Sequence, residues 1–163
     1  MDKVKIKRNV LGDTRTATRV PTFYEFVDSN KSHVYDVLNM MDALADDMHK
    51  VGKAHDFTKQ NDPEKSLFYR ELCATIEGQM NFADGSWYPM HCRTERHHLN
   101  ECCPEDVTLI DVLEMICDCV CAGMARSGSV RPVQISDDVL RKALDNTVKM
   151  CINSVEIVGQ QDE

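Results

Sequence analysis

Apolar residues recur at every third or fourth position through much of the chain, which is the period of an amphipathic α-helix. This pattern predicts four long helices, over residues 33–51, 63–80, 107–126 and 137–158. A short helix is also expected around His55 and Asp56. The hydrophobic pattern therefore predicts an all-α bundle of about five helices.

Polar caps and glycine set the expected helix boundaries. The polar segment 29–32 precedes the first helix and Gly52 follows it. Asp62 is the expected cap of the helix that starts with Pro63 in its first turn, and Asp106 is the expected cap of the helix over 107–126. These signals agree with the hydrophobic period, so each long helix has independent support.

Residues 81–106 lack a clear period and contain Gly85, Pro89 and Pro104. They are expected to form a loop with one helical turn around the histidines. Long loops without secondary structure of their own are usually functional. This segment is therefore a candidate for part of a site.

The first 28 residues alternate loosely between polar and apolar and break at Pro21, which predicts a short extended arm able to pair with another strand. They carry six basic and two acidic residues, a net charge of +4. The whole chain has a net charge of -8, which leaves -12 for the remainder. The expected organisation is a basic arm over 1–28 and a single helical domain over 29–163.

The bulk composition narrows the possible function. An acidic body makes nucleic acid an unlikely partner. The 163 residues contain no run of about 18 apolar residues, so no membrane span is expected. The eight cysteines lack zinc-ribbon spacing, and Met1-Asp2-Lys3 begins no signal peptide. We therefore expect reduced thiols and a cytoplasmic location.

Three acidic residues on the helix over 107–126 recur at steps of three and four, which places Asp111, Glu114 and Asp118 on one stripe. Like charges at this spacing repel each other. A solvent-facing stripe tolerates the repulsion, whereas a buried stripe would need a cation. Both interpretations remain open from the sequence.

Histidine and aspartate residues that could bind a metal occur in a definite order along the chain. Imidazole and carboxylate groups from successive helices can hold one or two divalent metals, and such metals activate water at neutral pH. The candidates are His33, His55, Asp56, His91, His97 or His98, and Asp118.

Other charged residues near these candidates could assist a reaction. Lys59, Arg93 and Arg96 could balance phosphate oxygens, although charged residues of this kind are more often ordinary solvated surface charge. Glu114 lies one helical turn before Asp118 and could be a ligand, a hydrogen-bond partner of a histidine, or a proton acceptor for water.

The order of these residues resembles the HD superfamily of metal-dependent phosphohydrolases. Three segments are more specific, and are similar to a family of small HD-like proteins of bacteriophages and bacteria that usually reads HDxSK, then WxxHxxxNxHH, then EMxxDW. In this chain they are residues 55–59, 87–98 and 114–118. Departures are Thr58 for Ser, Glu95 near the usual Asn, and Cys119 for Trp, so they concern the surroundings of the ligands.

The resemblance implies an HD-like helical bundle that holds one or two divalent transition metals (Mn, Fe, Zn, Co or Ni), with Mg as a further option. It implies that His33, His55, Asp56 and Asp118 hold one metal, and that Asp56 bridges to a second metal bound by His91 and His97 or His98. Asp56, Glu114 and Lys59 would then be catalytic, and Lys59, Arg93 and Arg96 would bind substrate.

The function that follows is hydrolysis of a phosphate ester, with a nucleotide or deoxynucleotide as the favoured substrate on family analogy alone. Two alternatives stay open: an HD-type diiron oxygenase, and a non-catalytic phage protein that binds metal and a host protein. A homo-oligomer is a further option. If the protein is phage-encoded, its expected location is the host cytoplasm.

Overall fold

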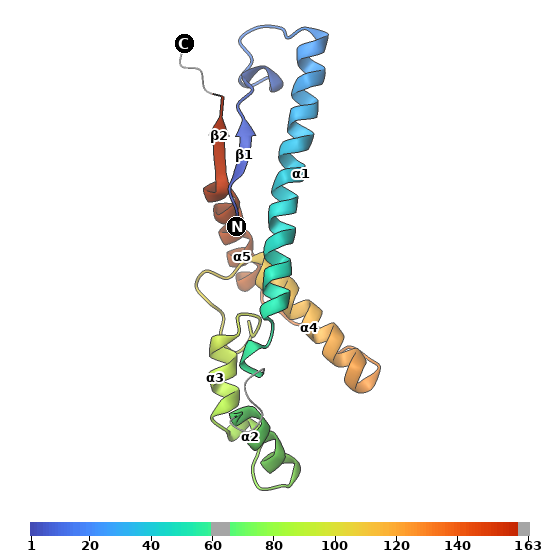
Figure 1. Ribbon diagram of the computed structural model, residues 1–163, viewed down its shortest axis with the longest axis vertical. Coiled ribbons are helices and arrows are strands. Elements are labelled where there is room, and N and C mark those ends of the chain that lie inside the picture. The colour runs from blue at the N-terminus through green and yellow to red at the C-terminus, as the bar shows by residue number, and fades with distance from the viewer. Residues whose placement is uncertain (60–65, 160–163) are drawn as a thin grey trace. The chain divides into compact units, whose positions relative to one another are not determined.

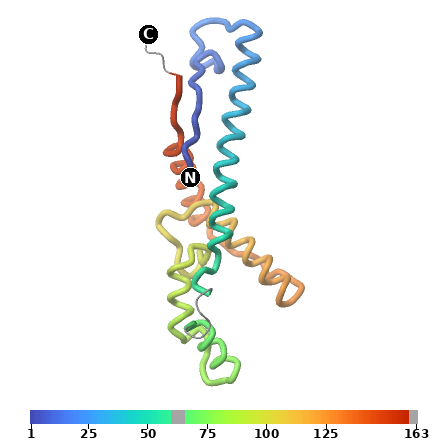
Figure 2. The backbone as a smooth tube through the Cα atoms, in the orientation of Figure 1, coloured from blue at the N-terminus to red at the C-terminus, as the bar shows by residue number. Residues whose placement is uncertain are grey.

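The computed structural model describes residues 1–59 and 66–159 and is mostly helical (Figure 1). These residues form five α-helices, three short 3-10 helices and a two-stranded sheet made from the two terminal segments, which run side by side (Figure 2). The expected all-α fold of about five helices with an extended N-terminal arm is confirmed. No helix in these two ranges is long and apolar enough to cross a membrane.

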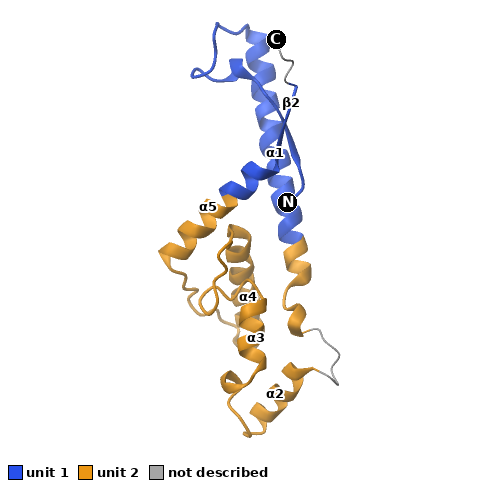
Figure 3. Cartoon of the chain, turned by 90° about the vertical axis from the view of Figure 1, so that its left-hand side faces the viewer, with its two compact units in different colours: residues 1–49, 148–163 blue, residues 50–147 orange. Residues whose placement is uncertain are grey.

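The chain divides into two compact units (Figure 3). The first unit comprises Met1–His49 and Val148–Glu163, and the second comprises Lys50–Thr147. Helices α1 and α5 each contribute residues to both units. The prediction of one domain over residues 29–163 is not tested by this division.

In the first unit, β1 (Val4–Lys7) pairs in parallel with β2 (Val155–Val158), with Val4 opposite Val155. The expectation that the arm pairs with another strand is confirmed. The partner strand corrects a second expectation, because residues 155–158 were predicted to be the end of a helix. Helix α5 (Asp137–Ser154) stops earlier, since three of the four residues that follow are β-branched and suit a strand.

Helix α1 (Phe23–Ala54) is longer than predicted at both ends. It begins inside the expected arm because Thr22 and Glu25 form a capping box: Glu25 Oε2 accepts from Thr22 N at 2.8 Å, and Thr22 Oγ1 accepts from Glu25 N at 3.3 Å. Gly52 does not end the helix, which continues to Ala54. None of the α1 residues is buried.

The second unit contains α2 (Leu67–Ile76), α3 (Trp87–Thr94), α4 (Leu109–Ser127) and the first part of α5. The predicted cap at Asp62 and start at Pro63 lie outside the described residues; α2 begins after Ser66, whose Oγ accepts from Tyr69 N at 3.2 Å, and ends before residue 80. The region 81–106, expected to be a loop, contains the two-turn helix α3.

Helix α4 begins two residues later than predicted, because Thr108 rather than Asp106 is its cap. Asp111 Oδ2 accepts from Thr108 N at 2.7 Å and from Thr108 Oγ1 at 2.9 Å. Gly128 ends the helix in the left-handed conformation, with φ of 68°, as glycine allows. The predicted helix over 107–126 is thus confirmed with shifted ends.

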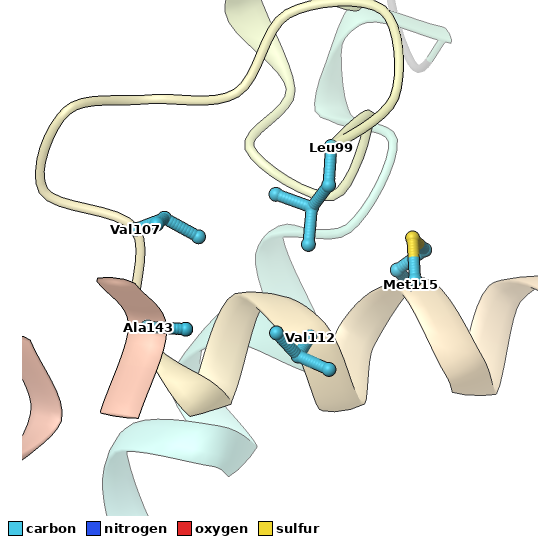
Figure 4. Packing of buried hydrophobic residues seen from close by; sticks show 5 residues of the cluster. All are labelled: Leu99, Val107, Val112, Met115 and Ala143. Carbon is cyan, nitrogen blue, oxygen red and sulfur yellow. The ribbon is translucent and has the colours of Figure 1, made fainter. Parts of the chain in front are cut away.

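The hydrophobic core of the second unit lies between α4, the start of α5 and the segment before α4 (Figure 4). Hydrogen bonds hold these parts together: Thr147 Oγ1 accepts from Leu109 N at 2.8 Å, and Asn146 Nδ2 donates to Val107 O at 3.0 Å. The buried core side chains are Leu99, Val107, Val112, Met115 and Ala143.

Helix α3 is fixed at its N-terminus by Glu71 of α2. The Glu71 carboxylate accepts from Ser86 N at 3.0 Å, Ser86 Oγ at 2.9 Å and Trp87 N at 3.0 Å. A negative charge at this position also complements the helix dipole. Gly85 leaves room for the carboxylate, since a Cβ at residue 85 would lie 2.1 Å from Glu71 Oε2.

Candidate metal centre

The His55-Asp56 pair lies where α1 ends and the chain turns into the 3-10 helix Phe57–Lys59. It does not lie on a short helix of its own, as the sequence predicted. Asp56 has a φ of 56°, and among the described residues it is the one non-glycine residue with positive φ. This conformation is uncommon and costs energy outside glycine, although aspartate tolerates it better than most residues. The turn brings the two adjacent side chains together, with His55 Nε2 3.4 Å from Asp56 Oδ2.

Three imidazoles approach the Asp56 carboxylate through their Nε2 atoms. His55 Nε2 lies 3.4 Å from Asp56 Oδ2, and His91 Nε2 lies 3.4 Å from Asp56 Oδ1. His97 Nε2 lies 3.8 Å from Asp56 Oδ1, and His55 Nε2 is also 3.5 Å from Asp118 Oδ1. Donors that share one metal ion lie roughly 3 to 3.5 Å apart, given bonds of about 2.0–2.2 Å.

The opposite ring atoms, Nδ1, of His55 and His97 face one carboxylate oxygen, and His55 forms a hydrogen bond with it. His55 Nδ1 lies 2.9 Å from Glu114 Oε1, and His97 Nδ1 lies 3.2 Å from the same oxygen. A carboxylate only accepts hydrogen bonds, so the proton of each neutral ring belongs on Nδ1. Contact of both Nδ1 atoms with Glu114 turns the Nε2 atoms of the two rings toward Asp56, which is how a carboxylate behind a histidine orients it as a metal ligand.

A relay through Thr58 orients His91 in the same way. Glu95 Oε1 accepts from Thr58 N at 2.9 Å and from Thr58 Oγ1 at 2.8 Å. The hydroxyl proton is thereby used, so Thr58 Oγ1 must accept from His91 Nδ1, at 2.6 Å. Trp87 stacks on the ring, with centroids 4.4 Å apart, and fixes its plane.

These contacts leave two kinds of acceptor facing each other, the Nε2 lone pairs and the carboxylate oxygens. Such an arrangement is repulsive unless a cation lies between them. Within the described residues, four buried side-chain atoms have no hydrogen-bond partner: the ring atoms Trp87 Nε1 and His97 Nδ1, and the two possible metal ligands Asp56 Oδ1 and His98 Nε2. A divalent metal would satisfy these two possible ligands, so the donor set fits a metal.

Three overlapping groups in the second unit have donor atoms close enough to hold an ion. Glu95 is the least suitable member, because its carboxylate already binds Thr58. His97 is shared by two groups. The groups are His91, His97 and His98; His55, His97 and Asp118; and Asp56, His91 and Glu95.

Burial and charge shift the pKa values of the cluster. Burial, helped by the neighbouring His98 and Lys59, lowers the pKa of His91 to about 4. Burial and His97 lower the pKa of His98. Burial opposes protonation of His97, but Glu114, Asp118 and Asp56 outweigh it and raise the pKa of His97. His91 and His98 are thus held neutral near pH 7, as metal ligands must be.

Lys59 and His33, two of the predicted site residues, belong to different units and have different surroundings. Lys59 Nζ donates to Asp56 Oδ2, so its ammonium group lies on the carboxylate proposed as the bridge. His33 is exposed, in the part of α1 that belongs to the first unit, 21 residues before the helix ends. His33 is in none of the three groups, and its ligand role stays a prediction.

The two predicted arginines have different surroundings. Arg96 forms a two-pronged ion pair with the buried Asp111, with Nε–Oδ1 of 2.7 Å and Nη2–Oδ2 of 3.0 Å, and Arg96 Nη1 contacts Asp106 Oδ1 at 3.0 Å. The pKa of Arg96 is raised, and the hydrogen bond to Asp111 is the main cause. These contacts tie Arg96 to the start of α4, whereas Arg93 is exposed at the end of α3.

The acidic stripe of α4 is divided between two roles. Asp111 caps α4 and pairs with Arg96, while Glu114 and Asp118 face the histidines. Sequence reasoning did not find the roles of Thr58 and Glu95, which it treated only as departures from a family pattern. A hydroxyl two residues after Asp56 and a carboxylate four residues after His91 are visible in the sequence, but their contact is not.

Comparisons of this chain with family models, with curated proteins and with solved structures found no match. The assignment of the site therefore depends on its own geometry. That geometry defines a mostly helical protein with a candidate metal-binding cluster of histidines and carboxylates.

Proposed function

We propose that this protein is a metal-dependent phosphohydrolase of the HD type that acts on a small phosphate ester. The observation that carries the proposal is the convergence of the Nε2 atoms of His55, His91 and His97 on the Asp56 carboxylate, with Nδ1 of His55 and of His91 held by a hydrogen bond. A nucleotide or deoxynucleotide is the substrate class that the family resemblance favours.

The residues divide into two sets around Asp56. His55, Asp118 and Asp56 Oδ2 would hold one divalent ion, and His91, His97 and Asp56 Oδ1 would hold a second. When bound, such ions act as Lewis acids toward phosphate and make water nucleophilic at neutral pH. Histidine-rich sets of this kind suit Mn, Fe, Co, Ni or Zn.

The chain's own groups supply orientation and charge. Glu114 keeps the protons of His55 and His97 on Nδ1, and this occupied carboxylate is better suited to positioning than to accepting a proton from water. Lys59 is the cation nearest to Asp56, and its ammonium group can turn to a phosphate oxygen, which would neutralise charge developed during displacement.

The test begins with elemental analysis of protein purified without chelator. It continues with a screen of phosphate esters, nucleotides included, with added Mn, Mg, Co or Ni. We expect one or two metals per chain and turnover that is lost in Asp56→Asn, which keeps the shape and tolerates positive φ. Asp42→Asn, at an exposed position in the first unit, is the matched control. No turnover with any ester and any metal would contradict the proposal.

A second candidate is a protein that binds metal without hydrolysing an ester. The contact between Lys59 and Asp56 favours it, because the ammonium group neutralises the oxygen that faces His55. This alternative predicts one metal per chain, held by the His91 and His97 side, and no turnover. Iron content together with oxygen uptake would instead indicate a diiron oxygenase.

A further inference from the structure

A cavity of about 590 Å³ opens beside the metal cluster in the second unit. Its walls come from residues 97–101, from one face of α4 and from residues 129–134. This volume lies in the range of about 300–1,000 Å³ that small-molecule sites occupy. The cavity is thus large enough for a nucleotide-sized ligand and too small for a folded partner.

Residues of the candidate metal centre and two arginines line the same cavity. His97, His98 and Asp118 contribute to it, and so do Arg126 and Arg131. Asp118 and Arg126 are eight residues apart on α4, and a rise of about 1.5 Å per residue separates their levels by roughly 12 Å. The cavity therefore has a metal-binding region and, farther along the same helix, a cationic region.

The segment with Arg131 is held against α4 by short contacts. A Cβ at Gly123 would lie 2.7 Å from Ser129 O and 3.2 Å from Val130 Cα, so glycine permits the close approach. Asn100 Nδ2 donates to Gln134 O at 3.1 Å, which fixes the other end of the segment. Arg131 therefore lies in a segment that is fixed at one end by its contact with Gly123 and at the other end by the hydrogen bond from Asn100.

Neither arginine is neutralised within residues 1–59 and 66–159. No carboxylate there lies within ion-pair distance of Arg126 or Arg131, in contrast to Arg96. Glu101 also lines the cavity, but its carboxylate lies 3.7 Å from His98 Nδ1, on the side of the histidines. The cationic region is therefore available to an anion.

Small and apolar groups lie between the two charged regions. Cys119, Ala122 and Gly123 follow Asp118 along the α4 face at helical spacing, and Val133 lies on the opposite segment. Such a floor accepts a flat or apolar part of a ligand without leaving polar groups unpaired. The order along α4 is metal ligand, small residues, arginine.

We propose that this cavity selects phosphate esters that carry a second anionic group, which Arg126 and Arg131 bind while the first phosphate lies at the metal cluster. This inference rests on the proposed function for the role of the metal end. Arginine suits the distal position because its planar guanidinium group pairs with two phosphate oxygens at once. The substrate class is a bisphosphate of nucleotide size.

Two probes that differ by one phosphate test the inference: adenosine 3′,5′-bisphosphate and adenosine 5′-monophosphate. Their dissociation constants are measured by calorimetry on protein loaded with Mn²⁺. We expect the bisphosphate to bind roughly ten-fold more tightly, as a charged hydrogen-bonded pair provides. The double variant Arg126→Gln, Arg131→Gln should lose this preference, while its metal content and its affinity for the monophosphate stay unchanged.

The control is Arg8→Gln, Arg141→Gln, which removes the same charge at exposed positions outside the cavity and should keep the preference. Equal affinity of the wild type for both probes would overturn the inference, as would a preference that survives in the cavity variant. Binding is scored separately from turnover. A preference for the bisphosphate, together with no turnover of any ester with any metal, would refute the proposed function and leave this inference standing.

Discussion

The two units of the molecule differ in what they bury. In the first unit, the buried side chains among the described residues are Val4 and Ser154, and apolar residues of α1 such as Val34 and Met41 remain 64% and 62% exposed. The second unit buries a hydrophobic core and also polar groups such as Glu71, His91 and Asp111. Buried polar groups are costly unless paired, so their clustering marks where the chain maintains a site.

Two histidines predicted to be metal ligands, His33 and His55, lie in these two different settings. His33 is exposed in the first unit, whereas His55 follows the last residue of the helix and binds Glu114 through Nδ1. Both fit the same sequence pattern of ordered metal ligands. The sequence pattern does not separate the two, whereas the hydrogen bond from His55 Nδ1 to Glu114 is the kind of contact that orients a metal ligand.

The largest expected effect separates these two histidines. His55→Gln should lower metal affinity by more than about 100-fold, because loss of a direct ligand exceeds the 10- to 100-fold cost of losing a ligand's partner. His33→Gln should leave metal affinity unchanged. Calorimetric titration with Mn²⁺ or Zn²⁺ measures both. An equal loss in the two variants would restore His33 to the ligand set.

Gly85→Ala should destabilise the second unit by about 1–3 kcal/mol, the usual cost of overpacking. The added Cβ would lie 2.1 Å from Glu71 Oε2 and 2.7 Å from Glu71 Cδ, so the carboxylate must leave the N-terminus of α3. Urea denaturation followed by Trp87 fluorescence measures the change. A variant as stable as the wild type would mean that Glu71 can move at little cost.

Thr58→Val tests the relay behind His91. Valine keeps the shape but removes the hydroxyl that links His91 Nδ1 to Glu95, so the ring loses its fixed proton position. We expect a 10- to 100-fold loss of metal affinity and, because His91 and Glu95 each lose a buried hydrogen bond, a free energy of unfolding lower by about 1–3 kcal/mol. Thr58→Ser keeps the hydroxyl and should retain most of the affinity; a loss equal to that of valine would exclude the relay.

His91 makes the stability of the metal-free chain depend on pH. Its pKa falls from about 6.5 in the unfolded chain to about 4 when folded. As the pH falls through this window, His91 takes up a proton in the unfolded chain before it does so in the folded chain. The contribution of His91 to the free energy of unfolding is therefore complete above about pH 6.5 and decreases at lower pH. Between pH 7 and pH 5 the expected loss is on the order of 1–2 kcal/mol.

Urea titrations in chelator at the two pH values measure this slope. His91→Gln should reduce it, while His49→Gln, in α1, should not. His97 contributes in the opposite sense, because its raised pKa gives stability that is lost as pH rises through the folded value. A slope that is unchanged in His91→Gln would show that another group determines it.

Much of the fold is predictable from the sequence, because the hydrophobic period is a local signal. It correctly indicates helices over most of α1, α4 and α5. It fails where contacts between distant residues determine the secondary structure. Helix α3 is too short to show a period, and Glu71 from another helix caps its N-terminus. The strand β2 likewise needs β1, which is about 150 residues away.

The sequence also predicts much of the cluster, since residue type and order bring forward His55, Asp56, His91, His97 and Asp118. The sequence cannot show which charged side chains are already paired with other residues of the chain. Arg96 is a reasonable phosphate ligand in the sequence, yet Asp111 binds it with two hydrogen bonds. Arg126 and Arg131 carry no such signal, and only the fold places them on the same cavity as Asp118.

The smallest expected effect concerns the part of α1 that leads to the cluster. Gly52 lies within the helix, its φ is not positive, and a Cβ there would meet no atom within 4 Å. Gly52→Ala should therefore raise the free energy of unfolding by roughly 0.5–1 kcal/mol, because glycine loses more backbone entropy on folding than alanine does. Thermal or urea denaturation measures the gain. Destabilisation would mean that the helix does not run through residue 52, and that His55 and Asp56 are positioned by a shorter segment.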